Sequence, residues 1–318
     1  DCLLSRGLGD VYKRQLYNEV QIGTKILIND GTIETIVKKI DGKDIICEVI
    51  NGGKLTNRKS INIPGMNINL PSITQKDIDD IKFGIIAGFD YIAASFVRKP
   101  EDVLAIRKIL EENDGTHIKI ISKIESQEGI DNFQSILEVS DGIMVARGDM
   151  GVEVAYEKLP GLQKKFIRKC FQAGKMVITA TQMLESMIHN NTPTRAEITD
   201  VANAIFDGTS GIMLSGETAM GDHPAKVVKT MAQIAVQAEN DAFEMGVYAG
   251  LKYDNDADDT TNAICDAACT TAKDLDAKAI IAVTKSGYTA RRVSKYRPQE
   301  PIIAPTPNLK TYHQLSLS

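Results

Sequence analysis

Polar residues suited to catalysis follow two short apolar segments of the sequence. Lys123 and Glu125 stand two positions apart at the end of segment 118–122, so their side chains point to the same side of an extended chain. Asp149 follows the next apolar segment, 142–146. Two carboxylates with room for water and substrate oxygens suit Mg²⁺ or Mn²⁺. A lysine beside them supplies the fixed positive charge that a phosphoryl group in transfer needs.

Two further residues extend this candidate site. Gly148 lies in the stretch 147–151 (RGDMG), which can direct backbone N–H groups toward an anion at the start of a helix. Thr181 adds a hydroxyl after the apolar segment 176–180. The alternative interpretation is a surface network of Lys–Glu–Asp ion pairs. The shared position of these residues after apolar strands favours the catalytic interpretation.

Alternating strands and helices must position these residues. Short apolar strands are predicted to begin near residues 91, 118, 142, 176 and 211, and amphipathic helices lie between them. Thr74-x-x-Asp77 and Thr194-x-x-Glu197 are capping boxes that open two of the helices. This alternation predicts βα units and a parallel sheet.

Both a doubly wound sheet and part of a (β/α)₈ TIM barrel contain such units. Polar residues after four successive strands, including Ser215 and Glu217 after the last, favour the barrel. The glycine-rich G-x-G-x-x-G motif expected after the first strand of a Rossmann fold is absent from the sequence. Because a closed barrel needs eight strands, the five predicted here indicate a partial barrel.

The segments before and after the predicted parallel sheet have different sequence patterns. Residues 1–15 show no periodicity, and their end (DVYKRQ) resembles a translated sequencing adapter, so we expect neither an element of the fold nor a function there. Residues 16–66 contain β-branched runs separated by turns such as Asn29-Asp-Gly31, which predicts hairpins of a small β domain. Residues 67–240 carry the partial barrel, and 241–318 form a third, α/β unit.

Composition narrows the functional classes. The 318 residues are 43% hydrophobic and 25% charged with a net charge of −5, which argues against disorder and against a general nucleic-acid binder. Uninterrupted apolar runs are too short to span a bilayer, and we expect no membrane association. Five scattered cysteines indicate reduced thiols and a cytoplasmic protein. Cys265 and Cys269 are spaced for one helix face, but no second pair stands near to complete a metal site.

Several motifs together resemble one family. Segments 120–125 (IISKIE), 144–149 (MVARGD), 179–187 (TATQMLESM), 193–197 (PTRAE) and 212–219 (IMLSGETA) resemble those of pyruvate kinases, in the same order. Segments 59–65, 296–298 and 313–317 add further similarity, so the resemblance covers about residues 16–318. It implies a TIM barrel with an inserted β-barrel lid domain and an α/β C-terminal domain, all three partial in this chain.

The resemblance also implies an activity, the transfer of a phosphoryl group from phosphoenolpyruvate to ADP in glycolysis. Lys123 is expected to stabilise the phosphoryl group in transfer, and Thr181 to help protonate the enolate. Glu125 and Asp149 are the expected ligands of Mg²⁺ or Mn²⁺. Gly148 and Asp149 are expected to contact phosphoenolpyruvate, together with Lys123 and Thr181. The family also implies a homotetramer and a K⁺ ion, whose ligands are expected in an N-terminal part that this chain lacks.

Two further sites follow from the resemblance. Lys59, on the lid side, is expected to reach the nucleotide phosphates. The loop after a C-terminal strand is a candidate effector loop, with the expected ligands Thr284, Ser286, Gly287 and Thr289. Lys285 departs from the acidic residue found there in some family members. We expect the fragment alone to be inactive. A pyruvate-metabolising aldolase or lyase and a non-catalytic scaffold are the competing hypotheses.

Overall fold

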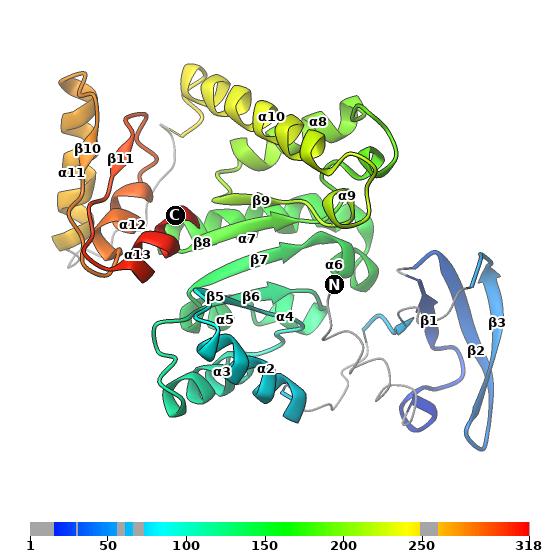
Figure 1. The fold of residues 1–318 in the computed structure, drawn as a ribbon. Coiled ribbons are helices and arrows are strands. Elements are labelled where there is room, and N and C mark those ends of the chain that lie inside the picture. Colours follow the sequence, from blue (N-terminus) through cyan, green and yellow to red (C-terminus); the bar gives the residue numbers. More distant parts are fainter. Residues whose placement is uncertain (1–15, 30, 56–60, 66–72, 249–259, 318) are drawn as a thin grey trace.

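The computed structural model describes residues 16–29, 31–55, 61–65, 73–248 and 260–317. The adapter-like segment 1–15 and Lys59 therefore lie outside the described residues. Three separate sheets form within the described ranges, one of five strands, one of four and one of two. Figure 1 shows the five-stranded sheet between the other two.

The five-stranded sheet is parallel throughout. Its strands lie side by side in chain order, as β5 (Tyr91–Ala94), β6 (Lys119–Ile124), β7 (Gly142–Ala146), β8 (Met176–Ala180) and β9 (Gly211–Met213). Each strand predicted between residues 91 and 215 is thus confirmed. Every residue of β7 is buried, as expected for a strand in the middle of a parallel sheet that is covered on both faces.

Helices connect these strands. They are α2 (Gln75–Ile86), α3 (Pro100–Glu112), α4 (Gln127–Asp131), α5 (Phe133–Val139), α6 (Arg147–Glu153), α7 (Leu159–Ala173), α8 (Arg195–Phe206), α9 (Gly216–Ala219) and α10 (Pro224–Glu244). Both predicted capping boxes, at Thr74 and Thr194, are present. Asn132 leaves the helical conformation and separates α4 from α5.

The main core lies between β6, β7 and the helices around them. It includes Ile124, Val145 and Phe166, all fully buried. Phe133 of α5 stacks on Phe166 of α7 with ring centroids 4.1 Å apart, which joins the two helices over one face of the sheet. This packing fixes the strand ends that carry the candidate site.

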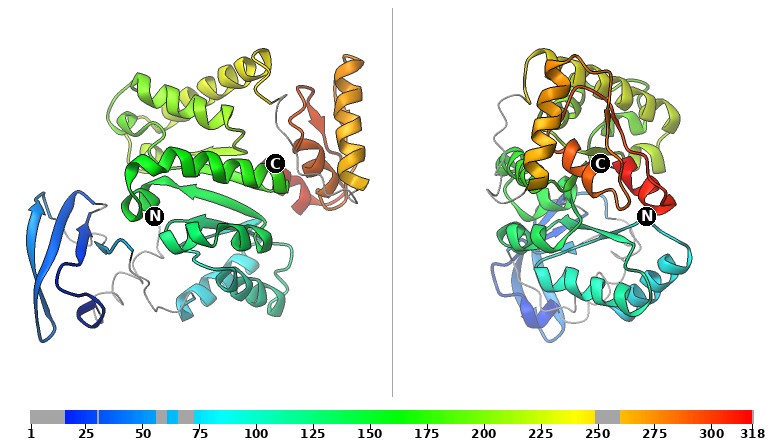
Figure 2. Two further views of the ribbon diagram at one scale, coloured as in Figure 1. Left: turned by 180° about the vertical axis from the view of Figure 1, so that it is seen from behind. Right: turned by 90° about the vertical axis from the view of Figure 1, so that its left-hand side faces the viewer.

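A small β unit precedes the parallel sheet. Strands β1 (Lys25–Ile28), β2 (Ile33–Asp41), β3 (Asp44–Asn51) and β4 (Ile61–Asn62) form an antiparallel sheet in the order β3-β2-β1-β4, which confirms the predicted hairpins. Gly42, with φ +63°, provides the left-handed residue of the β2–β3 turn. The unit has its own core around Val37 and lies beside α6 (Figures 1 and 2).

A third unit follows α10. It consists of α11 (Thr260–Asp274), β10 (Ile280–Ile281), α12 (Tyr288–Ser294), β11 (Ile302–Ile303) and α13 (Leu309–Gln314), with β10 parallel to β11. Gln314 of α13 contacts the large sheet unit, since its side chain donates to the carbonyl of His117 at 2.7 Å. None of the helices described here has the length and apolarity that crossing a membrane requires.

Candidate active site

The candidate site lies at the carboxyl edge of the parallel sheet, where the C-terminal ends of β5 to β9 meet. Lys123 and Glu125 form an ion pair there, with the Lys123 Nζ 2.7 Å from Oε1 of Glu125. Both side chains are largely removed from solvent, at 16% and 1% exposure. The sequence-based expectation that these two side chains point the same way is confirmed.

Two groups of the loop after β5 also bind this ion pair, and they were not predicted from the sequence. The Lys123 ammonium donates to Oγ of Ser95 at 2.9 Å, and the backbone N–H of Phe96 donates to Oε2 of Glu125. Phe96 has φ +53°, a left-handed conformation that is rare for a bulky residue. The polar Ser95 at the end of an apolar strand was a usable sequence signal, whereas the backbone conformation of Phe96 was not.

Gly148 and Thr181 meet across β7 and β8. The N–H of Gly148 donates to Oγ1 of Thr181 at 2.7 Å. A Cβ at position 148 would lie 3.3 Å from that oxygen, so glycine permits the close approach. Thr181 and Gln182 have φ +70° and +55°. Strained backbone of this kind persists where surrounding contacts enforce it, and it gathers at functional sites.

Arg147 enforces the conformation around Thr181. Its Nε donates to the carbonyl of Thr181 at 3.2 Å, and its Nη1 lies 2.7 and 2.8 Å from the two carboxylate oxygens of Asp200 on α8. Arg147 therefore binds the backbone end of β8, and we assign it a positioning role.

Glu217 likewise binds backbone groups. It is fully buried and accepts from the N–H groups of Leu184 and Ser215 at 3.1 and 2.8 Å, which ties together the loops after β8 and β9. Of the polar residues predicted after the strands, Arg147 and Glu217 thus bind the backbone of the loops around the site. Lys123 and Glu125 meet in one pair, and Gly148 and Thr181 meet in another.

Asp149 and Glu153 share the short helix α6. Asp149 stands in the first turn, where a carboxylate is favoured by the helix dipole. Burial raises the pKa of Glu153 to about 7, and the charge of Asp149 also raises it, while a hydrogen bond with Asn62 of β4 opposes the shift. The same hydrogen bond links the β unit to the helix that carries Asp149.

The residues present fit a hard divalent cation. Within the described residues the Lys123 ammonium, 2.7 Å away, is the contact that Oε1 of Glu125 makes, and it leaves this buried carboxylate oxygen a second lone pair for a cation. No group of three potential His, Cys, Asp or Glu ligands occurs among the described residues. Mg²⁺ commonly takes only one or two carboxylates and completes its shell with water and substrate phosphates.

The candidate effector loop joins β10 to α12. Thr284 is buried and its N–H donates to the carbonyl of Pro305 at 3.1 Å. Gly287 has φ +79° and precedes the first turn of α12, and Ser286 and Thr289 are exposed. The structure thus places Thr284, Ser286 and Gly287 in the loop after β10 and Thr289 in the first turn of α12, separate from the carboxyl edge of the parallel sheet.

The arrangement is that of an α/β protein whose charged site lies at the carboxyl ends of parallel strands, the usual position of active sites in this class. The sequence matches the family model described as "Pyruvate kinase, barrel domain" over residues 9–228 and the one described as "Pyruvate kinase, alpha/beta domain" over residues 262–318. The chain belongs to the pyruvate kinase family.

Curated relatives agree with the family assignment. The chain is 52% identical to a pyruvate kinase of Clostridium acetobutylicum over 305 residues, covering 96% of this chain and 64% of the relative. It is 54% identical to a pyruvate kinase of Staphylococcus saprophyticus over 312 residues, covering 95% of this chain and 52% of the relative. The chain therefore spans between about half and two thirds of the length of these relatives.

Proposed function

We propose that the protein to which this chain belongs transfers a phosphoryl group from phosphoenolpyruvate to ADP, giving pyruvate and ATP. The observation that carries the proposal is the buried Lys123–Glu125 ion pair at the carboxyl edge of the sheet. Farther along the same edge, Gly148 after β7 and Thr181 after β8 form the second contact of the site. The pyruvate kinases at 52 to 54% identity support this assignment.

Each residue has a distinct task in this proposal. Lys123 holds its ammonium beside Glu125 and Ser95, where positive charge stabilises a phosphoryl group in transfer. Gly148 follows β7 and its N–H meets the hydroxyl of Thr181 after β8, where Thr181 would help to protonate the enolate. The hydroxyl accepts from the N–H of Gly148 and donates to the carbonyl of Ala180 at 2.7 Å, so the group is oriented before substrate binds.

Glu125 and Asp149 would hold Mg²⁺ or Mn²⁺. When bound, the cation supplies charge neutralisation for phosphate and carboxylate oxygens. Gly148 and Asp149 would also contact phosphoenolpyruvate, and Lys59 would reach the nucleotide. A K⁺ requirement, a homotetramer and a cytoplasmic location are part of the same proposal, as is effector binding at residues 284–289.

The proposed architecture is a partial TIM barrel. Five parallel strands in uninterrupted chain order support it, because a doubly wound sheet reverses its strand order at a switch point. Residues 16–66 would be part of an inserted lid, residues 67–240 the barrel strands and helices, and residues 241–318 part of the C-terminal domain.

Metal binding is the direct test of this site in the 318-residue chain. Titration with Mn²⁺, followed by electron paramagnetic resonance of the free ion, should show one site that Glu125→Gln weakens by about tenfold or more, as expected when a ligand charge is lost. Glu138→Gln removes an exposed carboxylate on α5 and should leave Mn²⁺ binding unchanged. Equal binding by the two variants would contradict the assignment of Glu125.

Catalysis is tested in a coupled assay of pyruvate formation. Because the chain spans only part of the relatives, we expect little turnover from it alone, and activity in a form extended to their full length. Family-level rates from the 318-residue chain would overturn the first expectation. Aldol cleavage without ADP would overturn the proposed reaction and favour a lyase.

A further inference from the structure

Helix α13 of the C-terminal unit contacts the amino-terminal ends of β5 and β6. Gln314 of α13 is 4% exposed, and its side-chain amide donates to the carbonyl of His117 at 2.7 Å and to that of Asp90 at 3.3 Å. These carbonyls lie just before β6 and β5. The carbonyl of Asp90 also accepts from the N–H of Lys119 at 3.0 Å, so the amide of Gln314 binds where the pairing of the two strands begins.

The strand β5 binds α13 in return. The hydroxyl of Tyr91, the first residue of β5, donates to the carbonyl of Gln314 at 2.6 Å. Burial raises the pKa of Tyr91 to about 12, so the hydroxyl keeps its proton at neutral pH. Lys310 of α13 donates to the carbonyl of Gly88 and lies 3.4 Å from a carboxylate oxygen of Asp90. Three side chains therefore join the start of β5 to α13.

The C-terminal unit fixes α13 at the same time. Thr311 donates to the carbonyl of Lys285, in the loop after β10, at 3.0 Å. Leu317, which follows α13, packs against the apolar cluster that contains Ile121 of β6 and Met144 of β7. The position of α13 is thus set by one unit of the fold, and its hydrogen bonds reach another.

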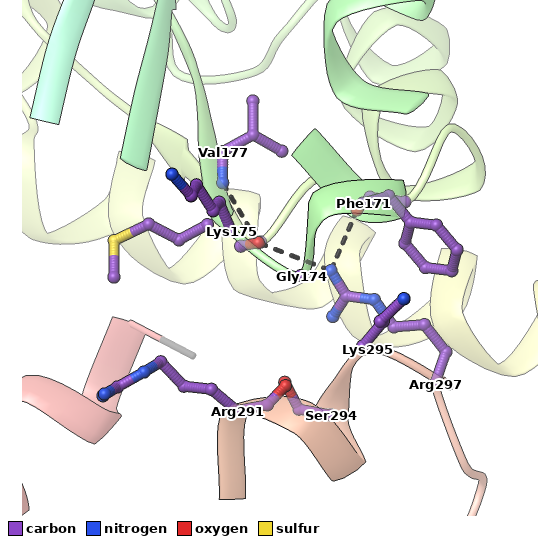
Figure 3. Close-up of a pocket in the computed structure, with 11 residues that line it drawn as sticks. Phe171, Gly174, Lys175, Val177, Arg291, Ser294, Lys295 and Arg297 are labelled. Carbon is purple, nitrogen blue, oxygen red and sulfur yellow. Dashed lines mark hydrogen bonds between the residues drawn. The ribbon is translucent and has the colours of Figure 1, made fainter. Parts of the chain in front are cut away.

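The two units are less closely joined beside α12. Figure 3 shows a pocket there, with Arg291 and Ser294 of α12 on one side and Lys175 and Val177 at the start of β8 on the other. The hydrogen bonds of α13 reach β5 and β6 instead. Their effect on these two strands is therefore separable from that of contacts elsewhere between the units.

The strand β5 is the part of the sheet most dependent on such support. Among the described strands it has four residues, lies at the edge and has β6 as its one neighbour. Its carboxyl end leads into Ser95 and Phe96, which bind the ion pair of the candidate site. Tyr91 and Ser95 are four residues apart, about 13 Å along a strand. A displacement at one end of so short a strand is carried to the other end.

We propose that Gln314 is a positioning residue of the candidate active site. By joining the starts of β5 and β6, it sets where the loop after β5 meets the Lys123–Glu125 pair. Binding groups work only when they are held within about 0.5 Å of the productive geometry, so a small shift of this loop weakens metal binding. The effect on metal binding rests on the proposed function, whereas the effect on the loop does not.

The test is Gln314→Met in the 318-residue chain, which removes both donors and keeps the length of the side chain. Hydrogen exchange resolved to single amides should quicken about tenfold at Phe96, whose N–H donates to Glu125, and should stay unchanged in β8. Titration with Mn²⁺, followed by electron paramagnetic resonance, should show binding weakened by about threefold or more. A merely structural role would quicken exchange evenly through the sheet and leave the Mn²⁺ affinity of the folded protein unchanged.

Matched variants make the outcome decisive. Gln237→Met replaces an exposed glutamine of α10 and should leave both measurements as in the parent. Tyr91→Phe removes a single hydrogen bond to α13, should change both measurements in the same direction by less, and replaces Gln314→Met if circular dichroism shows that variant to be unfolded.

Two results would overturn the proposal: exchange at Phe96 that stays at the parent rate, or exchange that quickens evenly through the sheet. An Mn²⁺ affinity equal to that of a binding parent would also overturn it. A parent that binds no Mn²⁺ would contradict the proposed function alone, and exchange at Phe96 would then decide for or against the role of Gln314.

Discussion

Replacing Arg147 by methionine should destabilise the sheet unit well beyond the loss of a surface ion pair. The guanidinium donates to the carbonyls of Ala180 and Thr181 and pairs with both carboxylate oxygens of Asp200. Its side chain is 12% exposed and that of Asp200 is 35% exposed. Methionine keeps most of the apolar stem, so the substitution removes mainly the polar contacts.

The size of the effect follows from these contacts. An exposed ion pair contributes about 0 to 1 kcal/mol, whereas hydrogen bonds to charged groups contribute about 1.5 to 3 kcal/mol each. The loss of Arg147 removes a donor from two carbonyls and leaves a half-buried carboxylate unpaired. After allowance for the solvent that reaches Asp200, we expect the free energy of unfolding to fall by about 2 to 4 kcal/mol.

Urea unfolding at neutral pH, followed by far-ultraviolet circular dichroism, measures this change. Arg168→Met removes an exposed arginine of α7 and should change the free energy of unfolding by less than about 0.5 kcal/mol. Arg147→Lys keeps the charge but loses the two-pronged contact with Asp200, so it should fall between the parent and the methionine variant. A loss below about 1 kcal/mol for Arg147→Met would refute the positioning role.

Four further substitutions test other parts of the structure by thermal or urea unfolding. Burial raises the pKa of Glu153 from 4.5 to about 7, so the stability that its proton contributes is complete below about pH 4.5 and is lost as the pH rises to 7. The free energy of unfolding of Glu153→Gln should therefore equal that of the parent at pH 4 and exceed it by about 1 kcal/mol at pH 8. Gly129→Ala would place a Cβ 2.6 Å from the carbonyl oxygen of Val97 and should cost about 1 to 3 kcal/mol, whereas Gly161→Ala, with no atom within 4 Å, should stabilise α7 by up to about 1 kcal/mol. Thr194→Ala removes the N-cap of α8 and should cost about 1 kcal/mol, and an unchanged midpoint would contradict the capping contact.

Much of the fold could be predicted from local patterns. The five parallel strands and the capping boxes at Thr74 and Thr194 were predicted because strand periodicity and caps depend on neighbouring residues in the chain. The short helix α4 was not predicted, since its five residues are too few to show a helical period. The pairing of Lys123 with Glu125 was also predictable, because two residues that are two apart on a strand share a side.

The sequence alone determined the residue types of the candidate site, the strand each one follows and, through the ordered motifs, the family resemblance. Only the tertiary structure decided which of those polar residues meet. Arg147 and Glu217 resemble site residues in the sequence, yet they bind the backbone of loops that lie more than thirty positions away in the chain. Ser95 and Phe96 enter the site because β5 lies beside β6.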